Sequence, residues 1–196
     1  MNKTLVVFAA LLFFTNVYAE NTNENVGAWS EAVNGLRGRL IVTQEKEVDG
    51  VQSPKVFLEL LNVANILNPI QIDAFNPESS FRCRLMDGAG KIIRSSPIGI
   101  REVGMPSFPL TIAIASSLRL NVNRHRMGAW FFGQTPPKQR TQIVLGDGVW
   151  VVDKESLGDY FLEGTFQIEE SKPVVFPKWS GTLKNPGVKI PRLKTD

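Results

Sequence analysis

Apolar and polar residues alternate along many short stretches of this chain. The alternation is clearest at 81–86, 118–122 and 160–169, where apolar side chains face one way and charged or polar ones the other. This period of two is typical of antiparallel strands with one buried and one solvated face. No long stretch has the spacing of an amphipathic helix. The pattern therefore predicts an all-β fold.

Short segments rich in β-branched and aromatic residues, with turn residues between them, define the expected strands. These segments are 36–43, 55–63, 69–73, 81–86, 91–94, 110–114, 118–122, 141–145, 149–152, 160–169 and 188–190. Asp-Gly pairs at 49–50, 87–88 and 147–148 lie between strands, and Asp-Gly favours the positive φ angles of tight hairpins. Short strands with frequent turns predict a β-sandwich.

Several of these segments resemble the strands of exported bacterial immunoglobulin-like domains, a group that includes small proteinase inhibitors. Residues 56–63 are similar to their second strand, 69–72 to the short strand after it, and 81–93 to their next hairpin. In addition, Gly158-Asp159-Tyr160 looks like a tyrosine corner, in which the hydroxyl bonds to nearby backbone. The resemblance implies an immunoglobulin-like antiparallel β-sandwich, here a single domain over 29–196 with a C-terminal extension, and it implies no functional residue.

The first nineteen residues have the layout of a secretory signal peptide. Lys3 supplies positive charge, an apolar run covers 5–14, and Val17-Tyr18-Ala19 is a small-x-small cleavage site. The run is shorter than the ~20 residues that a membrane-spanning helix needs, so we expect no transmembrane span. We predict a signal peptide at 1–19, a short flexible lead at 20–28, and an exported protein in the periplasm or outside the cell.

Charge is distributed unevenly along the chain. Without the leader the chain has 21 basic and 19 acidic residues, a net charge of +2, so we expect no nucleic-acid partner. Residues 81–140 carry 10 basic and 2 acidic groups, and 171–196 carry 6 and 1, whereas 20–80 and 141–170 are acidic. Because strands from these blocks interleave in a β-rich fold, the pattern predicts either charge pairing between neighbouring strands or a one-sided basic patch.

Residues suited to catalysis are sparse. His125 is the only histidine and lies between two arginines, which excludes sites that need two histidines and disfavours a catalytic triad. We expect no metal, no cofactor and no catalytic residue. The single cysteine, Cys83, alternates with apolar neighbours, so we expect it to face the core as a small apolar residue.

One segment, 121–132, combines cationic and aromatic side chains. Arginine and aromatic residues are enriched in binding hot spots, so this segment is the candidate contact surface for a protein or an anionic polymer. The candidate partner-binding residues are Arg124, His125, Arg126, Trp130 and Phe131. Alternatively, Trp130 and Phe132 are core residues of a strand, and the arginines form its solvated turn.

These observations favour a non-catalytic exported binding or interaction module. One alternative is an inhibitor or accessory subunit of an exported enzyme, acting through a loop such as 95–107. The other is a hydrolase that uses the dense acids of 147–163 as a carboxylate pair. The ligand and the oligomeric state stay open.

Overall fold

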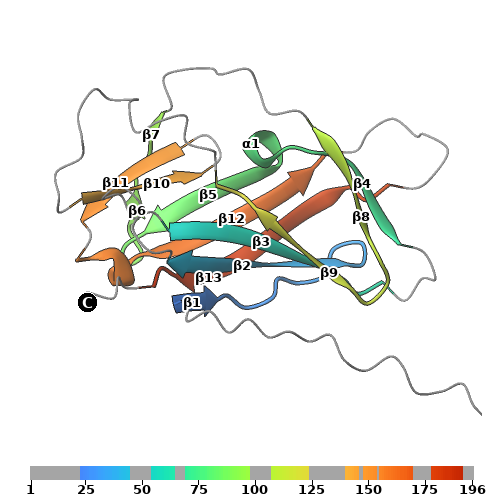
Figure 1. The fold of residues 1–196 in the computed structure, drawn as a ribbon, viewed down its shortest axis with the longest axis horizontal. Coiled ribbons are helices and arrows are strands. Elements are labelled where there is room, and N and C mark those ends of the chain that lie inside the picture. The colour runs from blue at the N-terminus through green and yellow to red at the C-terminus, as the bar shows by residue number, and fades with distance from the viewer. Residues whose placement is uncertain are drawn as a thin grey trace, which may run out of the picture.

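The chain is nearly all β, and its strands pair in antiparallel fashion (Figure 1). The computed structural model describes residues 23–44, 54–64, 69–97, 107–123, 140–145, 148–153, 155–169 and 178–191. The strands are β1 (Asn23–Val26), β2 (Leu36–Gln44), β3 (Pro54–Asn62), β4 (Ile70–Phe75), β5 (Phe81–Met86), β6 (Ile92–Ile93), β7 (Ser96–Pro97), β8 (Phe108–Ile112), β9 (Ser117–Asn121), β10 (Arg140–Leu145), β11 (Gly148–Asp153), β12 (Phe161–Ile168) and β13 (Gly181–Lys189). In the described part of the chain, the helical elements are a short helix, α1 (Pro77–Ser80), and a 3-10 turn at Leu157–Asp159. The coarse prediction of an all-β chain with antiparallel sheets is confirmed.

One four-stranded sheet has the order β1-β2-β3-β9. Leu40, Leu58 and Leu120 lie side by side across β2, β3 and β9, and they face the interior. Because side chains alternate along a strand, the next row points to the other face of the sheet. That outward row is Arg39, Glu59 and Arg119.

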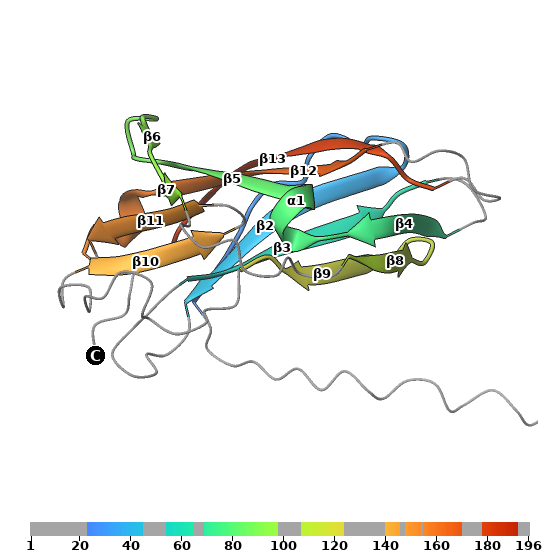
Figure 2. The same ribbon diagram turned by 90° about the horizontal axis from the view of Figure 1, so that it is seen from above.

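The second four-stranded sheet has the order β13-β12-β5-β6, and its buried residues belong to the same hydrophobic cluster as those of the first. Phe81, Phe166 and Leu183 form one of its inward rows. Gly164 lies where the two sheets meet, because a Cβ atom there would be 2.7 Å from the Phe81 ring and 3.2 Å from Leu40 Cδ1. Figure 2 shows β12 and β13 on one side of the molecule and β3 and β9 on the other.

Two smaller sheets complete the structure, β4-β8 and β10-β11-β7. An isolated bridge between Asn123 and Leu145 joins the end of β9 to β10. The Trp150 indole on β11 donates a hydrogen bond to the Ile93 carbonyl on β6 over 3.0 Å. The β10-β11-β7 sheet is therefore tied to both larger sheets.

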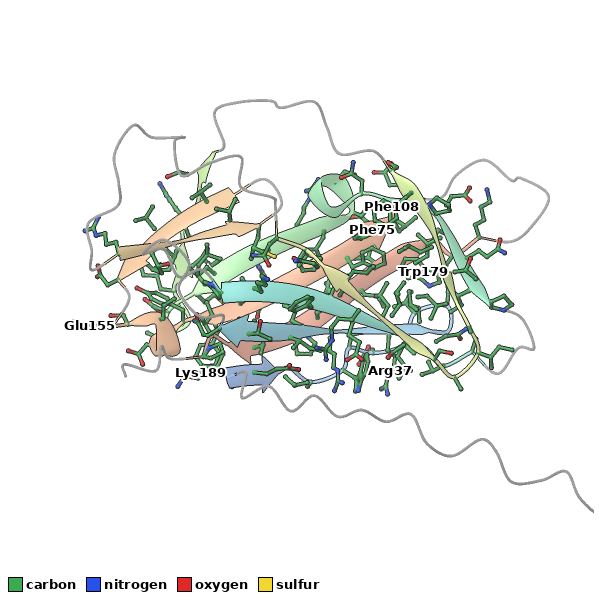
Figure 3. The ribbon with its side chains drawn as sticks, viewed as in Figure 1. Arg37, Phe75, Phe108, Glu155, Trp179 and Lys189 are labelled. Carbon is green, nitrogen blue, oxygen red and sulfur yellow. The ribbon has the colours of Figure 1, made fainter. Side chains whose placement is uncertain are left out.

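A single hydrophobic cluster draws residues from all four sheets. Part of this cluster is aromatic, and Figure 3 shows its Phe75 and Trp179 near the exposed Phe108. Trp179 stacks on Phe166 with 5.5 Å between ring centroids, and its indole donates a 2.9 Å hydrogen bond to the Val33 carbonyl. Trp179 thus fixes the start of β13 to the body of the protein.

The predicted strands at 36–43, 55–63, 81–86 and 141–145 match β2, β3, β5 and β10 to within one residue at each end. Cys83, the single cysteine of the chain, is half-buried against the core as expected. Two other predictions differ from the structure.

Part of the predicted flexible lead, 20–28, is a strand. β1 pairs with β2, and Asn25 Nδ2 donates a 2.8 Å hydrogen bond to the Lys189 carbonyl. Polar residues are tolerated there because β1 is an edge strand. A polar composition therefore did not exclude strand formation.

The predicted C-terminal extension contains a strand, because 181–189 is one long strand at the edge of the second sheet. Leu183 and Val188 are buried in the core. A register shift opposite Glu163 interrupts the alternation of buried and exposed positions between these two residues. The sequence pattern therefore did not predict a strand over this whole range.

Candidate functional site

The sequence-predicted contact residues, Arg124, His125, Arg126, Trp130 and Phe131, lie outside the described residues. Their role in partner binding stays a prediction. The residue before them, Asn123, accepts a hydrogen bond from the Val56 amide over 2.6 Å and donates one to the Pro54 carbonyl over 3.1 Å. The segment therefore begins at a point fixed to β3. Most of the loop at 95–107, named for the inhibitor alternative, also lies outside the described residues.

Two acids of the 147–163 segment, Asp153 and Glu163, are paired with arginines. Asp153 on β11 lies 3.4 Å from Arg140, and Glu163 on β12 lies 2.7 Å from Arg84. Within the described residues, no group of three or more His, Cys, Asp or Glu side chains could hold a metal ion. The hydrolase alternative stays a prediction.

Tyr160 lies near three aspartates. Burial, together with the carboxylates of Asp153, Asp87 and Asp159, raises the pKa of the Tyr160 hydroxyl above its ordinary value. The phenol is therefore held in its neutral form. The expected tyrosine corner is not supported, because this hydroxyl makes no hydrogen bond to any residue that the structure describes.

On the outer face of the first sheet, charged side chains are paired with one another. The Arg39 guanidinium lies 4.3 Å from the Trp29 ring centroid and donates a 2.6 Å hydrogen bond to Glu59. Ser117 donates to the other Glu59 oxygen over 3.0 Å. This side-chain network links β2, β3 and β9, so its charged groups are bound to one another within the sheet.

A second cation on the same face is also paired. Arg119 lies over the Phe57 ring, 5.8 Å from its centroid, and its guanidinium is 3.3 Å from a Glu24 carboxylate oxygen. This contact runs from β9 over β3 to the edge strand β1. Arg39 and Arg119 on this face are thus each paired with an acid.

The outer face of the second sheet is different. Arg82, Thr165 and Lys184 lie side by side across β5, β12 and β13, and all point outward. In the next outward row, Arg84 pairs with Glu163. We call this surface the basic face and define it by four cations: Arg82, Arg84, Lys184 and Lys189.

The basic face has an excess of positive charge. All four of its cations are exposed, and Glu163 is the single acid on the outward positions of β5, β12 and β13, which gives a net charge of +3. Among the described residues, Arg82 and Lys184 have no acidic partner, while Lys189 lies 5.9 Å from the Phe161 ring centroid. Like charges on one sheet repel, so this arrangement does not stabilise the fold.

The sequence held part of the signal for the basic face. The alternation at 81–86 placed Arg82 and Arg84 opposite the apolar residues, and the pattern at 160–169 placed Glu163 and Thr165 outward. What it did not reveal was that β5 and β13, from the two basic blocks, flank β12 from an acidic block. The structure contains both expected outcomes, charge pairing at Arg84–Glu163 and a basic patch around it.

Comparisons of the chain with protein-family models, with curated proteins and with solved structures give no match. In the part of the chain that the structure describes, no helix is long and apolar enough to cross a membrane.

Proposed function

We propose that the protein is a non-catalytic binding module that works outside the cytoplasm and holds a polyanionic ligand on the basic face. The observation that carries this proposal is the contrast between the two outer faces. Arg39 and Arg119 of the first sheet are paired with Glu59 and Glu24, and the Arg37 guanidinium donates to the Ser30 carbonyl. Arg82 and Lys184 of the second sheet have no acidic partner in the described residues. Charge left uncompensated on one surface attracts an oppositely charged partner.

The leader sequence supports a site of action outside the cytoplasm, because 1–19 has the three parts of a secretory signal peptide. For the fold, we propose an immunoglobulin-like β-sandwich with the two four-stranded sheets as its layers. Two glycines lie where the sheets approach closely, which supports two packed layers. A Cβ atom at Gly164 would meet Leu40 of the first sheet, and a Cβ atom at Gly38 would meet Asn185 and Leu183 of the second. Such a fold offers its flat outer faces for binding.

Binding of the chain from Glu20 onward to heparin and to poly-L-glutamate tests the function. We expect Arg82→Gln/Lys184→Gln to weaken binding of both polyanions at least about tenfold, a loss of ~1.4 kcal/mol, and wild-type affinity to fall as salt rises. The matched control, Arg119→Gln/Arg140→Gln, removes the same charge from other surfaces. Exposed ion pairs contribute ~0–1 kcal/mol, so all variants should stay folded.

A third variant separates the basic face from the sequence-predicted segment. If Arg124→Ser/Arg126→Ser abolishes binding and the basic-face variant does not, the segment is the contact surface and the basic face is not. Equal losses in the basic-face variant and its control would show that binding depends on net charge alone. Absence of binding to either polyanion contradicts the proposed function.

A further inference from the structure

We propose that the ligand of the basic face is an acidic polysaccharide, an inference that rests on the proposed function and narrows it to one chemical class. A polyanion needs only cations for its recognition. The basic face also carries neutral hydrogen-bonding side chains between its cations, and an apolar row lies beside them. Acidic polysaccharides are the polyanions that bind through all three kinds of contact: charge, hydrogen bonds and apolar packing.

The neutral hydrogen-bonding groups lie within the cationic rows. Thr165 is flanked directly by Arg82 and Lys184, and Gln167 and Thr182 pair in the next outward row. In the described structure, none of these three neutral side chains donates or accepts a side-chain hydrogen bond. Hydroxyl and amide groups both donate and accept, so they match the hydroxyls that accompany each acidic group of an acidic sugar.

The apolar row crosses the sheet at the other end of the basic face. Ile92, Met86, Phe161 and Lys189 lie side by side across β6, β5, β12 and β13. Strands are ~4.8 Å apart, so the row is about 14 Å long. Ile92 is 52% exposed, and the half-buried Phe161 ring and the Lys189 stem extend the apolar surface. The C–H faces of sugar rings pack on such a surface, and their acidic groups then reach the cations.

This surface suits a polysaccharide better than an anionic membrane. Insertion into lipid requires a large apolar face that projects from the protein. In the apolar row Ile92 is the exposed large hydrophobic residue, while Met86 and Phe161 are half-buried. The row is therefore too small an apolar surface for insertion, but it can pack against sugar rings beside the cations.

The test compares polyanions of equal charge concentration: polygalacturonate, which has sugar rings and carboxylates, poly-L-glutamate, which has carboxylates alone, and vesicles of phosphatidylglycerol and phosphatidylcholine. Neutral dextran is the uncharged control. We expect polygalacturonate to bind at least about tenfold more tightly than poly-L-glutamate. Thr165→Val should weaken polygalacturonate binding about fivefold, since one hydrogen bond is lost, and leave poly-L-glutamate binding unchanged.

Thr165→Ser keeps the hydroxyl and should bind polygalacturonate as the wild type does. If Thr165→Val unfolds, the exposed Thr182→Val replaces it in the same comparison. Equal binding of polygalacturonate and poly-L-glutamate overturns the polysaccharide inference and leaves the proposed polyanion site intact. Tighter binding to the vesicles than to polygalacturonate assigns the face to lipid and also overturns it. Binding to none of the polyanions removes the proposed function itself.

Discussion

Replacing Gly164 with alanine tests the packing that brings the two sheets together. The added Cβ atom would lie 2.7 Å from Phe81 Cζ, 2.8 Å from Phe81 Cε2 and 3.2 Å from Leu40 Cδ1. Carbon atoms do not approach so closely, so the Phe81 ring has to move. Phe81 and Leu40 are both fully buried, and the ring has no free space to enter.

The expected destabilisation combines two opposing effects. Forcing an extra carbon into a packed core costs ~1–3 kcal/mol. Alanine in place of glycine in a strand returns roughly 0.5–1 kcal/mol, because the unfolded chain loses less entropy on folding. The net loss should be about 0–2.5 kcal/mol, centred on ~1.3 kcal/mol. The central value corresponds to a fall in melting temperature of roughly 3–5 °C for a domain of this size.

Thermal and urea unfolding measure this change, with Gly187→Ala as the matched control on the neighbouring strand. A Cβ atom at Gly187 would lie 3.5 Å from Glu163 Cγ, an ordinary contact, so only the entropic gain applies and stability should rise by roughly 0.5–1 kcal/mol. In the double variant Phe81→Leu/Gly164→Ala, the smaller side chain should absorb part of the loss, giving a favourable coupling. If Gly164→Ala and Gly187→Ala change stability alike, the close packing of Gly164 against Phe81 and Leu40 is wrong.

Two further predictions concern buried aromatic groups. Tyr160 is the only tyrosine in a chain that begins at Glu20, so an alkaline titration of tyrosinate absorbance reports on it alone. The midpoint of this titration should lie above 10.0. A midpoint at or below this value contradicts the arrangement of acids around Tyr160. Because its pKa is raised in the folded state, its stabilising effect is complete below about pH 10 and is lost as the pH rises through the folded pKa. Trp179→Ala should lower the free energy of unfolding by ~3–5 kcal/mol, measured in urea. Trp179→Phe should cost clearly less, since phenylalanine keeps the stack on Phe166 and loses only the hydrogen bond to the Val33 carbonyl. Equal losses in the two variants would show that the stack contributes little.

The alternation of apolar and polar residues predicted most of the strands, because one face of each four-stranded sheet is exposed to solvent. At 81–86 the apolar residues Phe81 and Leu85 are fully buried, and Arg82 and Arg84 are exposed, as the pattern indicated. A period of two follows from strand geometry alone, so it can be read without knowing the partner strand. The prediction was weakest where local rules do not apply, at the register shift in β13 and in the polar edge strand β1.

The candidate site could not be read from the sequence because it depends on strand order. Arg82 and Lys184 are about a hundred residues apart, and they share a face because both β5 and β13 pair with β12. The segment that combined arginines with aromatics drew attention because its residues are contiguous. In the described structure, stacking of cations on aromatic rings instead joins residues distant in sequence, such as Arg119 and Phe57.

The identity of residue 165 offers the sharpest test of why the basic face is left uncompensated. A glutamate there would lie directly between Arg82 and Lys184, as Glu59 lies beside Arg39 on the other sheet. Each opposite-charge pair across strands contributes ~0.2–1 kcal/mol, so Thr165→Glu should leave the free energy of unfolding unchanged or raise it. The same substitution lowers the net charge of the face and should reduce heparin binding more than Thr165→Gln, a neutral control of similar size. A variant that gains stability and loses binding would show that the threonine serves the ligand and not the fold. Undiminished binding by Thr165→Glu would mean that the ligand site lies elsewhere.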